Sequence, residues 1–144
     1  MRRYVRRLSS LGPRGLADLL LLTVLAAIAE AGVRTRPLPS VAARFGLRLT
    51  GAATPASSWQ IAPRQRQRMA CVEMLLRHWP FIDPDAACLR RALLLGWVFR
   101  DRDPLLRIGV ARGEDGVTAH AWIEFDGRQM GGAAGHVPMP FQGL

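Results

Sequence analysis

The sequence predicts an α+β protein in which a helical N-terminal half packs on a small core of one helix and an antiparallel sheet. Apolar residues recur at helical spacing up to about residue 99, and residues 105–125 then alternate between apolar and polar side chains. An apolar fraction of 49% over 144 residues suffices for a buried core. The change of period places the sheet after the helices.

The first predicted helix covers residues 14–32. Its uncharged run from Leu19 to Ala29 is shorter than the ~20 residues that span a bilayer. Because a basic segment precedes it and Ala29-Glu30-Ala31 resembles a cleavage site, a secretory signal is the alternative. The apolar pattern resumes at Ala31 and Val33, which favours a core helix, a cytoplasmic protein and no membrane partner.

Two more helices are expected before the core, with a connector between them. Residues 40–47 (SVAARFGL) are helix-like, and residues 51–58 are rich in Gly, Ala, Thr, Pro and Ser. This connector divides the chain into a helical N-terminal region, 1–58, and a core domain, 59–144. The next helix covers about 64–79, and Cys71 within it is interpreted as a small buried hydrophobic residue.

A fourth helix is predicted from Asp83-Pro84, an N-cap followed by the first helical position, to about Phe99. Cys88 then lies near its first turn, where unpaired backbone N–H groups and the helix dipole favour a thiolate. A lone cysteine in an apolar helix is more often a core residue. Position alone therefore leaves both interpretations open.

The C-terminal part predicts two consecutive β-hairpins. Residues 105–111 and 117–125 alternate and are joined by 112–116, while Asp126-Gly127 is a favoured type I′ turn that leads into 128–130. The Gly- and Pro-rich tail, 131–144, is assigned no regular structure.

Alternation divides the second long strand into two faces. The small and branched side chains are expected to face the core, and His120 and Trp122 to look outward: Val117, Ala119, Ala121 and Ile123 against Thr118, His120, Trp122 and Glu124. If the outward face meets the helix that carries Cys88, a Cys–His pair follows. His78, at a helix end, and His136, in the tail, are weaker candidates.

Charge is distributed unevenly. The net charge of +9 comes from 20 arginines, and residues 1–70 carry +10 while residues 71–144 carry −1. The basic half suits an acidic protein or peptide, or is simply a solvated surface. No nucleic-acid partner is expected, because no helix-turn-helix or stacking motif accompanies the arginines. Two cysteines give neither a disulfide framework nor a zinc motif, which fits a reducing cytoplasm, and no metal or organic cofactor is indicated.

Several segments together resemble a known family. They are Cys88-Leu89, Arg91–Leu95, Leu106–Val110 and Ala119–Gly127, and their order and the 32-residue separation of Cys88 from His120 carry the likeness. The chain resembles the leader peptidase of lasso-peptide biosynthesis, a transglutaminase-like cysteine protease of the papain-like superfamily. The resemblance implies a transglutaminase-like core, Cys88 as the nucleophile and His120 as its base.

The same resemblance implies the substrate and the partners. The peptidase would remove the leader from a ribosomally made precursor, so that a lasso cyclase can close the macrolactam. The first 80 residues are helical and apolar rather than alternating, so a separate small leader-recognition protein is expected. A non-catalytic scaffold with the same fold is the alternative function, and acyl transfer instead of hydrolysis is a variant of the first.

The sequence departs from the family at the third catalytic residue. The family usually places an Asp or Glu about a dozen residues after the histidine. Here the hairpin register sets His120 opposite Ala133, and Gly131–Ala133 hold no acid. The histidine would then be oriented by water, by a backbone carbonyl, or by an acid from elsewhere such as Asp101 or Asp103. Gln129, the nearest polar side chain, should face Glu124. The backbone N–H of Cys88 would be one oxyanion donor.

Overall fold

The computed structural model describes residues 12–52, 60–78, 87–113, 116–131 and 137–138. Its helices are α2 (Gly12–Thr35), α3 (Leu38–Arg44), α4 (Pro63–His78), α5 (Ala87–Val98) and the short 3₁₀ helix η2 (Arg100–Arg102). Its strands are β1 (Leu105–Gly113), β2 (Gly116–Phe125), β3 (Arg128–Met130) and β4 (Val137–Pro138). Helices precede an antiparallel sheet of order β3-β2-β1-β4, so the predicted α+β class is confirmed.

The helices form where the sequence predicts them, with bounds shifted by a few residues. The first helix is longer than expected, the second begins after Pro37, and the third is shifted by one residue. The connector at 53–59 lies outside the described residues, as does Asp83-Pro84. α5 therefore begins, as described, at Ala87.

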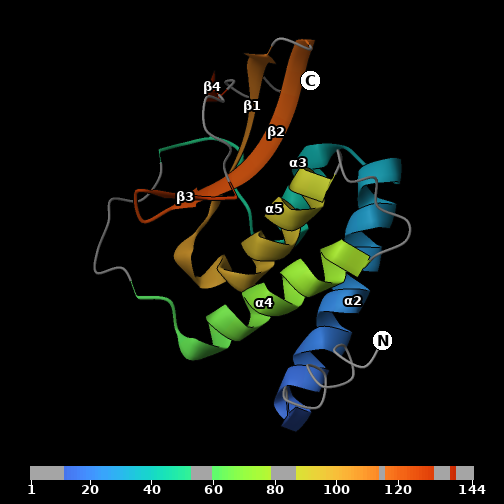
Figure 1. The fold of residues 1–144 in the computed structure, drawn as a ribbon. Helices are drawn as coiled ribbons and strands as arrows, with labels where there is room; N and C mark the ends of the chain where they lie inside the picture. The colour runs from blue at the N-terminus through green and yellow to red at the C-terminus, as the bar shows by residue number, and fades with distance from the viewer. Residues whose placement is uncertain (1–11, 53–59, 79–86, 114–115, 132–136, 139–144) are drawn as a thin grey trace.

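α5 is the central helix, and it packs against α2, α4, β1 and β2 (Figure 1). Leu93 and Leu94 are fully buried in one cluster with side chains from α2, α4 and the sheet. Gly96 permits the closest approach, because a β-carbon there would overlap the side chain of Leu47. The position of α5 thus depends on Gly96 having no side chain, as well as on apolar burial.

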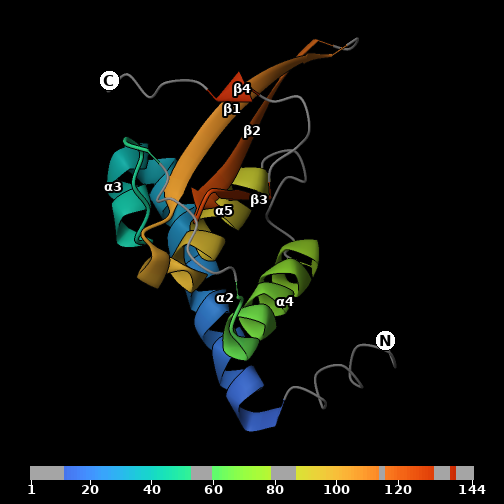
Figure 2. The ribbon, with the colours of Figure 1, turned by 90° about the vertical axis from the view of Figure 1, so that its left-hand side faces the viewer.

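The hairpin β1–β2 is the longest part of the sheet and extends beyond the helices (Figure 2). Asp126 and Gly127 both have positive φ, 48° and 67°, which is the type I′ turn that the sequence predicts. β3 pairs Ile123 with Met130 and Glu124 with Gln129, so the predicted register is also confirmed.

Two expectations about the sheet are wrong. The tail is not wholly irregular, because Val137 and Pro138 form β4 and pair with Val110 and Gly109. Such a two-residue strand leaves too short a pattern to recognise in the sequence. The second error concerns the faces of β2.

Val117 and Ala119 are exposed, although alternation assigns them to the core, whereas Trp122 is buried with 1% of its surface exposed. The helices lie only against the end of the hairpin that includes Leu105 and Phe125. Both faces are buried there, and the other end lies beyond the helices (Figure 2). Burial along β2 therefore follows distance from the helices more than alternation.

Candidate active site

Cys88 is the second described residue of α5. It is half-buried and packs against the apolar cluster beneath it. The first turn of a helix holds backbone N–H groups without intrahelical acceptors, and these favour negative charge. Cys88 is therefore partly accessible and lies near the first described residue of α5, whose predicted start at Asp83-Pro84 lies outside the described residues.

Cys71 is different. It is buried in the middle of α4, with 1% of its surface exposed. Burial raises the pKa of this thiol, and the negative charge of Asp18 raises it further. The interpretation of Cys71 as a core residue is confirmed, and it provides an internal reference thiol for Cys88.

His120 lies half-buried in β2, at the point where burial along the strand changes. Its ring stacks on Trp122, with centroids 6.2 Å apart and planes inclined by 20°. Its Nε2 is 2.5 Å from the carbonyl oxygen of Gly131. Since a carbonyl only accepts, Nε2 carries the proton, and the lone pair of the neutral ring is on Nδ1.

Gly131 connects His120 with α5. It directly follows β3 and has a φ of +76°, which a glycine adopts without strain. A β-carbon at this position would lie 3.6 Å from Cδ of Arg91, and Arg91 is one turn after Cys88 on α5. Arg91 is itself held by Glu73 of α4 at 2.9 Å. The His120 acceptor therefore lies beside the first two turns of the cysteine helix.

His120 also lies at an edge of the sheet. On one side of β2, β1 pairs Gly109 with His120; on the other side β3 pairs only with Ile123–Phe125, and in the described part of the chain no strand continues on that side beside His120. By alternation, Ala121 and Ile123 occupy the face of β2 that belongs to the apolar cluster with α5, and His120 occupies the opposite face. Gly131, at the edge, is within reach of both the His120 ring and α5.

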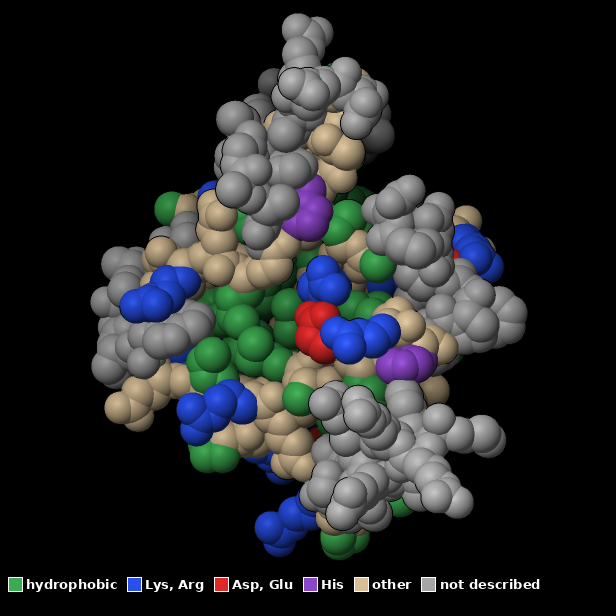
Figure 3. Space-filling model, in the orientation of Figure 1, with side chains coloured by type: hydrophobic (Ala, Val, Ile, Leu, Met, Phe, Trp, Pro, Cys, Tyr) green, Lys and Arg blue, Asp and Glu red, His purple; other side chains and the backbone are tan. Residues whose placement is uncertain are grey.

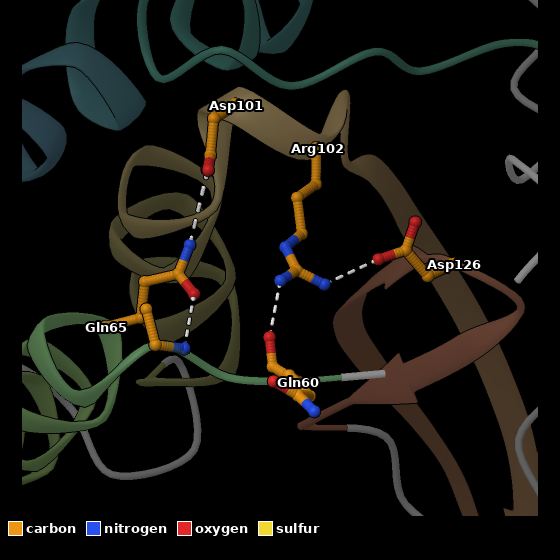
Figure 4. Close-up of polar contacts among 6 residues, drawn as sticks. Gln60, Gln65, Asp101, Arg102 and Asp126 are labelled. Atoms are coloured by element: carbon orange, nitrogen blue, oxygen red, sulfur yellow. Dashed lines mark hydrogen bonds and ion pairs between the residues drawn. The ribbon is translucent and has the colours of Figure 1, made fainter. Parts of the chain in front are cut away.

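The acids that the sequence offers to orient His120, Asp101 and Asp103, are bound elsewhere. Asp101 accepts from Gln65 of α4 at 3.4 Å, and neighbouring Arg102 binds Asp126 and the carbonyl of Gln60 (Figure 4). Asp103 pairs with Arg48 at 2.8 Å. Of the alternatives that the sequence leaves open, the structure has the backbone carbonyl in contact with His120.

Glu124 binds Trp122, on which the His120 ring stacks. Its carboxylate accepts from Trp122 and Gln129, each at 3.2 Å, and from Arg107 at 2.9 Å. Burial alone would raise the pKa of Glu124, but the hydrogen bonds from Arg107, Trp122 and Gln129 outweigh it and lower the pKa. The sequence predicts that Gln129 faces Glu124, but it gives no sign that Trp122 is buried and bound to the same carboxylate.

Within the described ranges, no group of three or more His, Cys, Asp and Glu side chains is arranged to hold a metal ion. The parts that could react are a thiol at a helix start and an imidazole of fixed tautomer on an adjoining strand. A cysteine on a helix and a histidine on a strand are residue types that thiol chemistry can use.

A family model described as the transglutaminase-like superfamily matches residues 32–139, and the chain belongs to this superfamily, which includes cysteine proteases. The match covers α3, α4, α5 and the sheet, together with the end of α2. It crosses the division at 58/59, which stays a prediction. No curated protein and no solved structure matches the chain.

Proposed function

We propose that the protein is a cysteine endopeptidase that removes the leader from a ribosomally made lasso-peptide precursor. Membership of the superfamily supports cysteine chemistry. The observation that carries the proposal is the fixed tautomer of His120, whose Nε2–H binds the Gly131 carbonyl beside the helix of Cys88. The resemblance of the segments around Cys88 and His120 to the leader peptidases supports the substrate.

The proposed reaction requires Cys88 and His120 to meet. Alternation places the His120 ring on the face of β2 opposite the apolar cluster that includes α5, so the ring must reach Cys88 around the edge of β2 beside Gly131. Nδ1 of His120 takes the thiol proton, and Sγ of Cys88 attacks the scissile carbonyl carbon. The oxyanion accepts a hydrogen bond from the backbone N–H of Cys88 at the start of α5. The imidazolium then protonates the departing amine, which leaves a thioester on Cys88. Water, deprotonated by His120, hydrolyses the thioester and restores the thiol.

The carbonyl of Gly131 takes the orienting role that an acid has in the family. It fixes the ring and the tautomer as a carboxylate does, but it brings no full negative charge to stabilise the imidazolium. We therefore expect a slower enzyme than one with a complete triad. The rate should rise if a carboxylate is supplied near the ring.

The partners of this proposal are the precursor peptide, a separate small leader-recognition protein and the lasso cyclase, all in the cytoplasm. The described parts of residues 12–78 support a separate recognition protein. They hold helices and one isolated bridge, Arg48 with Leu105, rather than a sheet that could bind a leader.

Cleavage of a precursor peptide, followed by mass spectrometry with the recognition protein present, tests the proposal. Cys88→Ala should abolish cleavage, and Cys71→Ala should retain it as the matched control. In parallel, iodoacetamide should label Cys88 far faster than Cys71, and His120→Ala should slow the labelling of Cys88. Undiminished cleavage by Cys88→Ala would refute the peptidase.

The alternative is a non-catalytic scaffold with the same fold. It is supported by the sequence after Asp126, which contains no Asp or Glu to complete a triad. A scaffold predicts that the lasso peptide matures normally with Cys88→Ala and that deletion of the whole chain stops maturation. The peptidase predicts that both changes stop it.

A further inference from the structure

Helix α2 presents a continuous apolar face to solvent. Five large side chains on it are between 40% and 62% exposed: Leu16, Leu20, Leu21, Val24 and Ile28. Three small exposed residues, Ala17, Ala27 and Ala31, lie among them. At about 100° per residue, all eight fall within one sector of about 140°, and they extend over about 22 Å. We call these eight residues the apolar face of α2.

The acidic residues of α2 point the other way. Asp18 is buried and contacts Arg68 at 2.9 Å, and Glu30 is buried and contacts Arg90 at 2.8 Å. Hydrogen bonding from Arg90 lowers the pKa of Glu30, so this carboxylate stays charged and paired. α2 therefore buries both of its acids against α4 and α5, while five of its large aliphatic side chains are exposed; an ordinary surface helix has its charged side chains on the exposed face.

Arginines border the apolar face of α2. Arg14 lies before its first residue, and Arg34, exposed and ion-paired with Glu30 at 2.7 Å, lies after its last; α2 has no exposed acid. On the face of the molecule in Figure 3, arginines are widely spread, and most of the visible acidic atoms form one patch between arginines. An arginine thus lies at each end of the apolar face, and the chain has a net charge of +9, which suits an anionic partner.

The chemistry of the face favours lipid over protein. None of its eight side chains can form a hydrogen bond, whereas protein interfaces carry about one hydrogen bond per 100–200 Å². Fluid acyl chains require none. A second copy would bring arginines against arginines, since α2 offers no exposed acid and the chain has a net charge of +9.

By length and composition alone, α2 is long and apolar enough to cross a membrane. Only 28% of its most apolar 18-residue window is buried in the fold, less than in a core helix. Crossing would separate Asp18 and Glu30 from Arg68 and Arg90 and leave charges without partners in lipid. The N-terminal end of α2 projects beyond α4 in both ribbon views, so the helix can reach a flat surface without leaving the fold (Figures 1 and 2).

We propose that the apolar face of α2 docks this protein on an anionic lipid bilayer, with α2 lying in the plane of the headgroups. The aliphatic side chains enter the boundary between headgroups and acyl chains, and Arg14 and Arg34 contact anionic headgroups. This proposal does not depend on the peptidase reaction. It replaces the expectation from the sequence that no membrane takes part.

The test is flotation of the purified full chain with vesicles of phosphatidylcholine and phosphatidylglycerol, and with vesicles of phosphatidylcholine alone. The wild type should float with the mixed vesicles and much less with the neutral ones, and added salt should weaken the binding. Leu20→Glu should reduce the partition coefficient about tenfold or more, because it removes a large apolar group from lipid and adds a charge.

Val117→Glu is the matched control, because Val117 is 67% exposed on the sheet and the substitution is of the same kind. It should bind vesicles like the wild type. Arg14→Gln with Arg34→Gln should lower binding to the mixed vesicles only. Circular dichroism should show that all variants fold.

Three results would overturn the proposal. The first is a wild type that stays with the bottom fraction of both vesicle types. The second is Leu20→Glu binding as strongly as Val117→Glu. The third is a wild type that light scattering shows to be a dimer, that does not bind vesicles, and that becomes a monomer with Leu20→Glu. This result would assign the apolar face of α2 to a second copy of the chain.

Discussion

The two halves of β2 have the same backbone and opposite environments. Ala121, Trp122 and Ile123 are buried, whereas Val117 and Ala119 are exposed on the part of the hairpin that extends beyond the helices. His120 lies between the halves and is half-buried. The base proposed here, His120, must be both held in place and reachable, and a position between the packed and the open half of a strand meets both needs.

The largest effect should come from the packed half. Trp122→Ala removes a fully buried side chain that also donates to Glu124, so it should lower the free energy of unfolding by about 3–5 kcal/mol. Urea denaturation at neutral pH measures this loss. A change below about 1 kcal/mol would show that Trp122 is not packed as described.

A smaller loss is expected where α5, which supports the packed half, approaches Leu47. Gly96→Ala should destabilise the fold by about 1–3 kcal/mol, because the new methyl group overlaps the side chain of Leu47. In the double variant with Leu47→Ala, the total loss should be smaller than the sum of the two single losses. Additive losses would contradict a direct contact between the two positions.

Charge at the boundary should appear as a pH dependence. The pKa of Glu124 is lower in the folded protein than its ordinary value of 4.5, so its stabilisation is present above about pH 4.5 and is lost as the pH falls further. Glu124→Gln should cost about 1 kcal/mol at pH 7. This difference from the wild type should shrink as the pH falls below 4.5, and a constant difference across that range would contradict the assignment.

The smallest effect is expected in the open half. Val117→Ala should change the free energy of unfolding by less than about 0.5 kcal/mol, because the side chain is mostly exposed. The same urea titrations measure it. A loss comparable to that of Trp122→Ala would show that both halves of β2 are covered and would remove the distinction between them.

Local pattern predicted most of the fold. Helical spacing located α2, α4 and α5 to within a few residues, and Asp126-Gly127 located the turn that sets the register of β3. These features depend on neighbours in the sequence. The burial of Trp122 does not, because it depends on where the helices end against the hairpin, and that is set by packing between distant segments.

The site was also predictable only in part. Cys88 and His120 stand out by residue type and element, and their pairing stays a prediction. The contact of His120 with Gly131 could be stated only as one alternative among several, since any backbone carbonyl near the ring would serve. A motif search detects side chains, and the partner found here has none.

That partner gives the site an unusual genetic property. Every amino acid at position 131 carries the same carbonyl oxygen, so no codon change removes the acceptor of His120 directly. Substitutions at this position can act only by bending the chain, through the positive φ of Gly131 or its closeness to Arg91. Variation among relatives here should therefore be limited by backbone shape rather than by chemical identity.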